Sequence, residues 1–116
     1  MIKMSLFLTR RSDLTFEQFS DYWMNKHWPI VQTVPEVMDN TIRYTQQHSI
    51  GGIPEGVPAA PFDGYAEAWF PDMDALYKVI GAPKWAEVVA KDDLNFLDPS
   101  KTLVLISEEK LDYRAA

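Results

Sequence analysis

Residues 2–31, IKMSLFLTRRSDLTFEQFSDYWMNKHWPIV, contain the change of periodicity that decides the fold. Apolar side chains alternate over residues 2–9, which predicts a strand, because successive strand residues point to opposite faces. Beyond Thr15, apolar and aromatic side chains recur at helical spacing, which predicts one buried face of a helix. Thr15 and Gln18 have the positions of a capping box at its start. The segment therefore predicts a strand followed by an amphipathic helix.

Within that helix, Pro29 is expected to cause a kink or a restart. Its ring disfavours a helical conformation at the preceding residue, Trp28. A short apolar turn should follow and end at Pro35.

The rest of the chain alternates between further strands and helices. The pattern predicts strands at 40–49, 64–70 and 102–110, helices at 72–80 and 83–93, and a long structured loop at 51–63. The loop is longer than usual connections, which favours a role in covering a site. The tail from residue 111 should be irregular.

The order strand, helix, strand, strand, helix, strand is the split βαβ of ferredoxin-like domains. We therefore expect an α+β fold with an antiparallel sheet and both helices on one face, formed as one domain by residues 1–116. The strands are apolar on both faces, with Leu6 and Leu8 on one and Phe7 on the other. A sheet with one solvated face would not show this pattern. A second copy of the chain is the simplest cover, so the sequence predicts a homodimer.

Composition excludes several classes of function. The net charge is −6 and no basic stripe is present, which argues against binding nucleic acid or anionic membranes. No apolar run is long enough to cross a bilayer, and no secretory leader is evident. The absence of cysteine excludes disulfides, thiolate metal sites and a cysteine nucleophile. These features suit a cytoplasmic protein.

Three motifs resemble those of the EthD domain family: FSDYWMNKHWPIV at 19–31, DGYAEAWF at 63–70 and WAEVVAKDDLNFLD at 85–98. The resemblance implies a dimeric α+β barrel built from ferredoxin-like protomers. It also implies an oxidoreductase role in degrading ethers or aromatics, or cofactor-free lyase, isomerase or cyclase chemistry as in related domains. The 51–61 loop lies where members of the family vary, so we expect it to influence substrate choice.

His27 is the first catalytic candidate. It shares a helical stripe with Phe19 and Trp23, so it should point at the sheet, and imidazole exchanges protons near neutral pH. The alternative is a core histidine bonded to a backbone carbonyl, but His27 belongs to the first motif of the family. His48 shares a strand face with Tyr44 and is either a second catalytic group or an exposed histidine at a strand end. If both histidines face one cavity, one can act as base and the other as acid.

Carboxylates provide further candidates. Glu67 lies between Tyr65 and Trp69 on one strand face, where desolvation would make it a usable acid or base. The alternative is a structural ion pair with Arg43. Asp92 and Asp93 end the last helix, where they oppose its negative pole. The resemblance singles out this neighbourhood, so Asp92 is kept as a binding candidate.

The aromatic side chains either belong to the core or form the walls of a pocket for a flat substrate. The candidates are Tyr22, Trp23, Tyr44, Trp69, Trp85 and Phe96. Two histidines without a third ligand predict no metal site, and the sequence has no phosphate-binding glycine loop.

The favoured hypothesis is a cofactor-independent enzyme in which His27 moves a proton on an aromatic, lactone or polyketide-derived substrate, helped by His48, Tyr44 or Glu67. Isomerisation, dehydration, decarboxylation and cyclisation all remain open. One alternative is an oxygen-dependent oxidation, in which His27 would ligate haem. The other is a ligand-binding module without catalysis.

Overall fold

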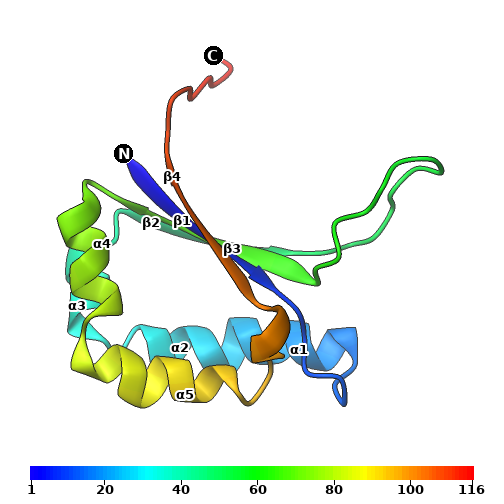
Figure 1. Ribbon diagram of the computed structural model, residues 1–116, viewed down its shortest axis with the longest axis horizontal. Coiled ribbons are helices and arrows are strands. Elements are labelled where there is room, and N and C mark those ends of the chain that lie inside the picture. The colour runs from blue at the N-terminus through cyan, green and yellow to red at the C-terminus, as the bar shows by residue number, and fades with distance from the viewer.

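Four antiparallel strands form one sheet in the order β2-β3-β1-β4 (Figure 1). The computed structural model describes residues 1–116. The strands are β1 (Ile2–Leu8), β2 (Arg43–His48), β3 (Gly64–Phe70) and β4 (Leu103–Glu108). Strand β1 pairs with β3 and β4, and β2 pairs with β3, so β2 and β4 are the edges. This arrangement confirms the predicted ferredoxin-like α+β class.

The helical segments gather on one side of the sheet (Figure 1). Between β1 and β2 lie α1 (Phe16–Tyr22), the π-helical turn η1 (Trp23–His27), α2 (Trp28–Val31) and α3 (Pro35–Asn40). Between β3 and β4 lie α4 (Met73–Ile80), a second π-helical turn η2 (Trp85–Val89), α5 (Ala90–Asp93) and the short 3-10 helix η3 (Pro99–Lys101).

No helix is long and apolar enough to cross a bilayer.

The capping box at the start of α1 is present as predicted. The Gln18 backbone N–H donates to Thr15 Oγ1 at 3.1 Å, and the Thr15 N–H donates to Gln18 Oε1 at 2.9 Å. Two backbone N–H groups at the N-terminus of α1 thereby have hydrogen-bond acceptors, which fixes where α1 begins.

The predicted break at Pro29 is wrong. Trp28 is helical, with φ −57° and ψ −45°, and the helix continues into α2. The reason is the wide turn η1, in which the Trp28 N–H reaches the carbonyl of Trp23 five residues earlier. Pro29 then falls in the first turn of α2, where its missing N–H costs little.

The segment before β2 also differs from the prediction. Residues 35–40 form helix α3, where no helix was predicted, and β2 begins at Arg43 rather than at residue 40. Pro35 suits the first turn of this helix, and the Asn40 side chain donates to the Glu36 carbonyl at 2.8 Å near its end. The side-chain bond competes with strand pairing at Asn40.

The core lies between the helices and one face of the sheet. Met4, Ala68 and Phe70 on the sheet pack against Leu76 and Val79 of α4. A smaller cluster, towards α1, contains Leu8, Phe19, Trp23, Ala66, Phe96 and Leu97. The two clusters form the floor and walls of the site described below.

The other face of the sheet carries no helix in this chain. On this face Leu103 and Leu105 of β4 keep 54% and 55% of their surface, and on the helix side of the same edge strand Val104 and Ile106 keep 57% and 43%. Exposed apolar patches of this kind usually mark an interaction surface. The prediction that one sheet face is left bare is therefore confirmed for the protomer.

The loop between β2 and β3 projects away from the sheet and the helices (Figure 1). All residues from 49 to 61 are exposed. Within one protomer the loop lines a hollow of about 440 Å³ against Phe7 and Tyr65, but it does not line the cavity described below.

Candidate active site

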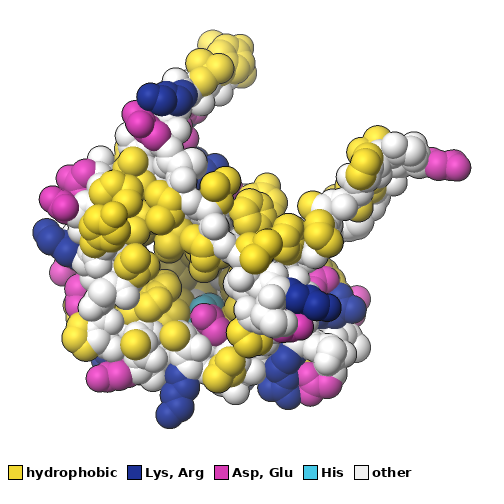
Figure 2. All heavy atoms as spheres, viewed as in Figure 1, with side chains coloured by type: hydrophobic (Ala, Val, Ile, Leu, Met, Phe, Trp, Pro, Cys, Tyr) yellow, Lys and Arg dark blue, Asp and Glu magenta, His cyan; other side chains and the backbone are white.

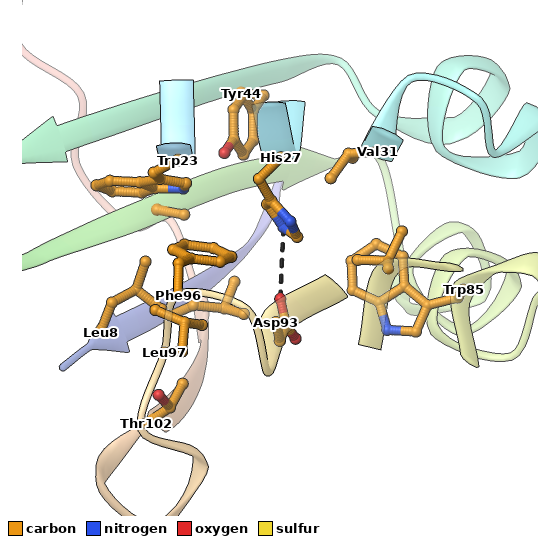
Figure 3. Close-up of a pocket in the computed structure, with 13 residues that line it drawn as sticks. Leu8, Trp23, His27, Val31, Tyr44, Trp85, Asp93, Phe96, Leu97 and Thr102 are labelled. Carbon is orange, nitrogen blue, oxygen red and sulfur yellow. Dashed lines mark ion pairs between the residues drawn. The ribbon is translucent and has the colours of Figure 1, made fainter. Parts of the chain in front are cut away.

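A cavity of about 70 Å³ lies between the helices and the sheet (Figure 3). Ten of its thirteen lining residues are hydrophobic, and the polar ones are His27, Asp93 and Thr102. The walls are Leu6, Leu8, Trp23, Val31, Tyr44, Ala66, Trp85, Val89, Phe96 and Leu97. Figure 2 shows the hollow from its open side, with a histidine and an acidic side chain in the recess. A few polar groups among apolar walls are typical of a small-molecule site, and a substrate larger than this volume would extend through the open side of the cavity.

His27 comes from the π-helical turn η1 and points into the cavity, as the sequence predicts (Figure 3). It is 6% exposed, and its ring packs against Phe96 with 4.7 Å between centroids. Its Nδ1 lies 2.7 Å from Asp92 Oδ2. A π-helical turn inside an α-helix often marks a functional site, because it turns a side chain out of the regular spacing.

Asp92 holds the imidazole in place. Its Oδ1 accepts hydrogen bonds from the Tyr22 hydroxyl at 2.6 Å and from Asn95 Nδ2 at 3.0 Å. Burial alone would raise the pKa of Asp92, but the hydrogen bonds from Tyr22, His27 and Asn95 lower it below its ordinary value. The carboxylate is therefore ionised and accepts the Nδ1 proton of His27. This assignment leaves the Nε2 lone pair of His27 free.

Asp93 meets that free nitrogen. Asp93 follows Asp92 in α5, and its Oδ1 lies 3.4 Å from His27 Nε2 (Figure 3). Burial and the charge of Asp92 raise the pKa of Asp93 to about 7. Burial lowers the pKa of His27, although Asp92 partly opposes this effect. Near neutral pH the imidazole is thus neutral, and Asp93 exists in both protonation states, so the pair can donate or accept a proton.

Tyr44 lies in the cavity wall, as expected of a binding residue. Its ring stacks on Trp28 at 4.4 Å, and its oxygen accepts a hydrogen bond from Gln46 Nε2 at 3.0 Å. Burial raises the pKa of Tyr44, so its hydroxyl keeps its hydrogen.

His48 does not share the cavity with His27. It stacks on Trp23, with 4.3 Å between centroids, while Trp23 itself lines the cavity. His48 Nδ1 lies 2.6 Å from Ser20 Oγ, and its Nε2 lies 2.9 Å from Gln46 Oε1. Burial lowers the pKa of His48. The structure therefore does not bring the two histidines together as an acid and a base.

Glu67 and Trp69 lie on the opposite face of the sheet from the cavity. Glu67 accepts from Lys3 Nζ at 2.6 Å and from Thr45 Oγ1 at 3.3 Å. Glu67 does form an ion pair, but its partner is Lys3 and not the predicted Arg43, which stacks over Trp69 at 4.6 Å. Neither side chain reaches His27.

The other predicted binding residues fall into two groups. Trp23, Trp85 and Phe96 line the cavity, whereas Tyr22 and Asp92 lie behind His27 and orient it. Asp93 and Thr102 were not among the predicted site residues. The signal for Asp93 was present in the sequence, because a carboxylate at the negative end of a helix is unfavourable unless it has a use.

No group of three or more histidine, aspartate or glutamate side chains is arranged to hold a metal ion.

Comparison with known proteins agrees with this architecture. The family model of the EthD domain matches residues 11–100. An EthD family protein from Bacillus halodurans superimposes with a TM-score of 0.71 at 17% identity, over 95% of this chain and 99% of that one. An EthD-like protein from Ralstonia eutropha gives a TM-score of 0.70 at 20% identity, over 92% and 89% of the two chains.

A dimeric protein of unknown function with a ferredoxin-like fold, from Bacteroides fragilis, superimposes with a TM-score of 0.65 at 12% identity. The alignment covers 93% of this chain and 95% of that one. At these identities the structural likeness establishes the fold alone. No curated protein matches the sequence. Because the family model spans most of the chain, this protein belongs to the EthD domain family.

Proposed function

We propose that this protein is a small cofactor-independent enzyme that moves a proton on an apolar small molecule, with His27 and Asp93 as its acid–base pair. The observation that carries the proposal is the 3.4 Å approach of His27 Nε2 and Asp93 Oδ1 at an apolar cavity. A pKa of about 7 at Asp93 suits a group that must both accept and return a proton. One positioned group of this kind contributes about 10²–10⁴-fold in rate.

The step that this pair supports best is proton abstraction from a carbon next to a carbonyl. The Asp93 carboxylate takes the proton, and the electron pair of the C–H bond moves towards the carbonyl oxygen. The Tyr44 side chain lines the same cavity, and its hydroxyl is the proposed donor to that oxygen. Return of the proton to another atom completes an isomerisation, and loss of a hydroxyl group as water completes a dehydration.

The lining of the cavity restricts the substrate class. Trp23, Tyr44, Trp85 and Phe96 provide aromatic walls, and no lysine or arginine lines the cavity. An anionic substrate would meet Asp93 without a compensating cation. We therefore propose a neutral aromatic, lactone or polyketide-derived substrate, which such walls suit.

The proposed functional unit is a homodimer. Support comes from the apolar β4 strand and from the sheet face that carries no helix. The similar Bacteroides fragilis protein is dimeric. Face-to-face packing of two such sheets would bury side chains that one protomer leaves exposed.

The donor geometry favours proton transfer over coordination of haem iron by His27. Both ring nitrogens already face carboxylate oxygens, Nδ1 at 2.7 Å and Nε2 at 3.4 Å. An iron at Nε2 would have to displace Asp93.

Deuterium uptake by 2-tetralone in D₂O tests the proposal, because this flat neutral ketone has acidic C–H bonds next to its carbonyl. We expect uptake, followed by NMR, to exceed the buffer rate and to fall about 10²-fold in His27→Gln and Asp93→Asn. Glu67→Gln is the matched control, since Glu67 lies on the other sheet face. Equal loss in all three variants would contradict the proposal. If aromatic lactones and phenolic ketones raise the melting temperature of the protein but neither they nor 2-tetralone take up deuterium, the protein is instead a binding module.

A further inference from the structure

Asp92 and Asp93 are adjacent in sequence but face different spaces. Asp93 lines the inner cavity, whereas Asp92 lines a groove of about 660 Å³ on the outer side of the helices. Thr33, Glu87, Lys91 and Asn95 also line this groove. The outer groove is therefore a second place where solvent approaches the polar groups behind the cavity.

His27 connects these two spaces. Its Nε2 lies 3.4 Å from Asp93 Oδ1 on the cavity side, and its Nδ1 lies 2.7 Å from Asp92 Oδ2 on the groove side. The other oxygen of Asp92 accepts from Tyr22 and Asn95, which leaves Oδ2 to His27 alone. An imidazole can accept a proton at one ring nitrogen while it releases a proton from the other. The contacts thus link Asp93, which lines the cavity, through His27 to Asp92, which lines the groove.

An occupied cavity makes such a path useful. Asp93 keeps 36% of its side chain exposed in the open cavity, but His27 keeps only 7% and Asp92 7%. A substrate against Asp93 would displace the water that reaches it. The remaining polar neighbour through which His27 can exchange a proton is then Asp92.

We propose that Asp92 is a proton-relay residue that exchanges protons between His27 Nδ1 and water in the outer groove. The inference rests on the proposed function of the His27–Asp93 pair. Asp93 takes a proton from the substrate and passes it to His27 Nε2, while the Nδ1 proton moves to Asp92 Oδ2 and then to groove water. A proton that returns by the same path restores the Nδ1–H form of His27, so each cycle balances.

The test measures exchange of the His27 Nδ1 proton with water, by NMR of protein with ¹⁵N-labelled histidine and no substrate. We expect Asp92→Asn to slow the exchange about tenfold or more, because the amide still accepts the hydrogen bond but cannot take the proton. Asp93→Asn should leave the exchange within about twofold, because in the open, substrate-free cavity water can protonate Nε2 in place of Asp93. Glu87→Gln is the control, since Glu87 lines the groove without contacting His27.

A second variant distinguishes proton transfer by Asp92 from a purely structural role of Asp92. In Asp92→Ala, added formate should restore the exchange, because a small carboxylate can occupy the vacated position from the groove. A structural role alone predicts no recovery with formate. If Asp93→Asn slows the exchange as much as Asp92→Asn does, the proton leaves through the cavity and the proposal fails. Since no substrate is used, failure of the 2-tetralone experiment would not affect this result.

Discussion

Replacing each of two adjacent carboxyls by its amide is expected to change stability in opposite directions. Asp92 is stabilised as an anion by three donors, whereas Asp93 is an anion that burial and the charge of Asp92 disfavour. At pH 8, Asp92→Asn should therefore destabilise the fold and Asp93→Asn should stabilise it. The two substitutions are isosteric, adjacent and in the same helix, so each is the control of the other.

The magnitude for Asp93 follows from its pKa. The folded protein raises this pKa from 3.8 to about 7, so the protonated carboxyl is the favoured form. The stability that this group contributes is complete below pH 3.8 and is lost as the pH rises through about 7. For a fully buried group the loss would be about 4 kcal/mol. Because 36% of the Asp93 side chain is exposed, solvent screening reduces the expected gain of Asp93→Asn to about 1–2 kcal/mol at pH 8.

The magnitude for Asp92 follows from its hydrogen bonds. Its pKa is lowered, so its contribution is present above pH 3.8 and is lost only as the pH falls through the depressed folded value. Asp92→Asn replaces charge-assisted bonds from Tyr22 and His27 by neutral ones, which we expect to cost about 1–3 kcal/mol. Between pH 5 and pH 8 this cost should shrink, because Asp92→Asn also removes the charge that disfavours the Asp93 anion, and Asp93 ionises in this range.

Urea unfolding at pH 5 and pH 8, at one fixed protein concentration, measures both effects. The gain in Asp93→Asn should shrink as the pH falls from 8 to 5, whereas the loss in Asp92→Asn should grow over the same fall in pH. A loss of stability in Asp93→Asn at pH 8, or an equal effect at both pH values, would refute the reasoning.

Three further predictions concern the scaffold. Gly64→Ala should destabilise the fold by about 2 kcal/mol or more in urea unfolding, because an added Cβ would lie 2.5 Å from the Gln47 carbonyl oxygen and 2.9 Å from the Trp23 ring; an unchanged midpoint would contradict this packing. Phe96→Ala should cost about 3–5 kcal/mol by the same assay, since Phe96 is 1% exposed and packs on Phe19, Tyr22 and His27; a cost below about 1 kcal/mol would show that the cavity wall is not built this way. Leu105→Lys, on the sheet face without helices, should convert a dimer to a species near 13.3 kDa in sedimentation experiments; a wild-type protein that already sediments as a monomer would refute the proposed dimer.

The order of strands and helices was predictable from sequence because it depends on local periodicity. Alternation in residues 2–9 and the capping box at Thr15 fix the first strand and the first helix without reference to the rest of the chain. The helix α3 at Pro35–Asn40 was missed because six residues are too short to show a helical period. The continuity through Pro29 was missed because a π-helical turn departs from regular α-helical spacing.

The site was only partly predictable. The alternation of side chains along a strand indicates which residues share a sheet face, but not which face the helices cover. Tyr65, Glu67 and Trp69 do share a face, yet it is the face without helices. His48 shares the helix-facing side with Tyr44, but the indole of Trp23 stacks on it outside the cavity. His27 was predicted because it lies on the apolar, buried stripe of its helix. The place of Asp93 in the site depends on where α5 ends relative to η1, which the sequence pattern does not indicate.

The pH titration of the Asp93 carboxyl carbon, followed by ¹³C NMR, tests the central claim most directly. That claim is a carboxyl balanced between its two protonation states beside the free nitrogen of His27. The structure predicts a midpoint near 7 for Asp93. A midpoint close to the ordinary value of 3.8 would contradict the account, because Asp93 would then be unable to return a proton at neutral pH.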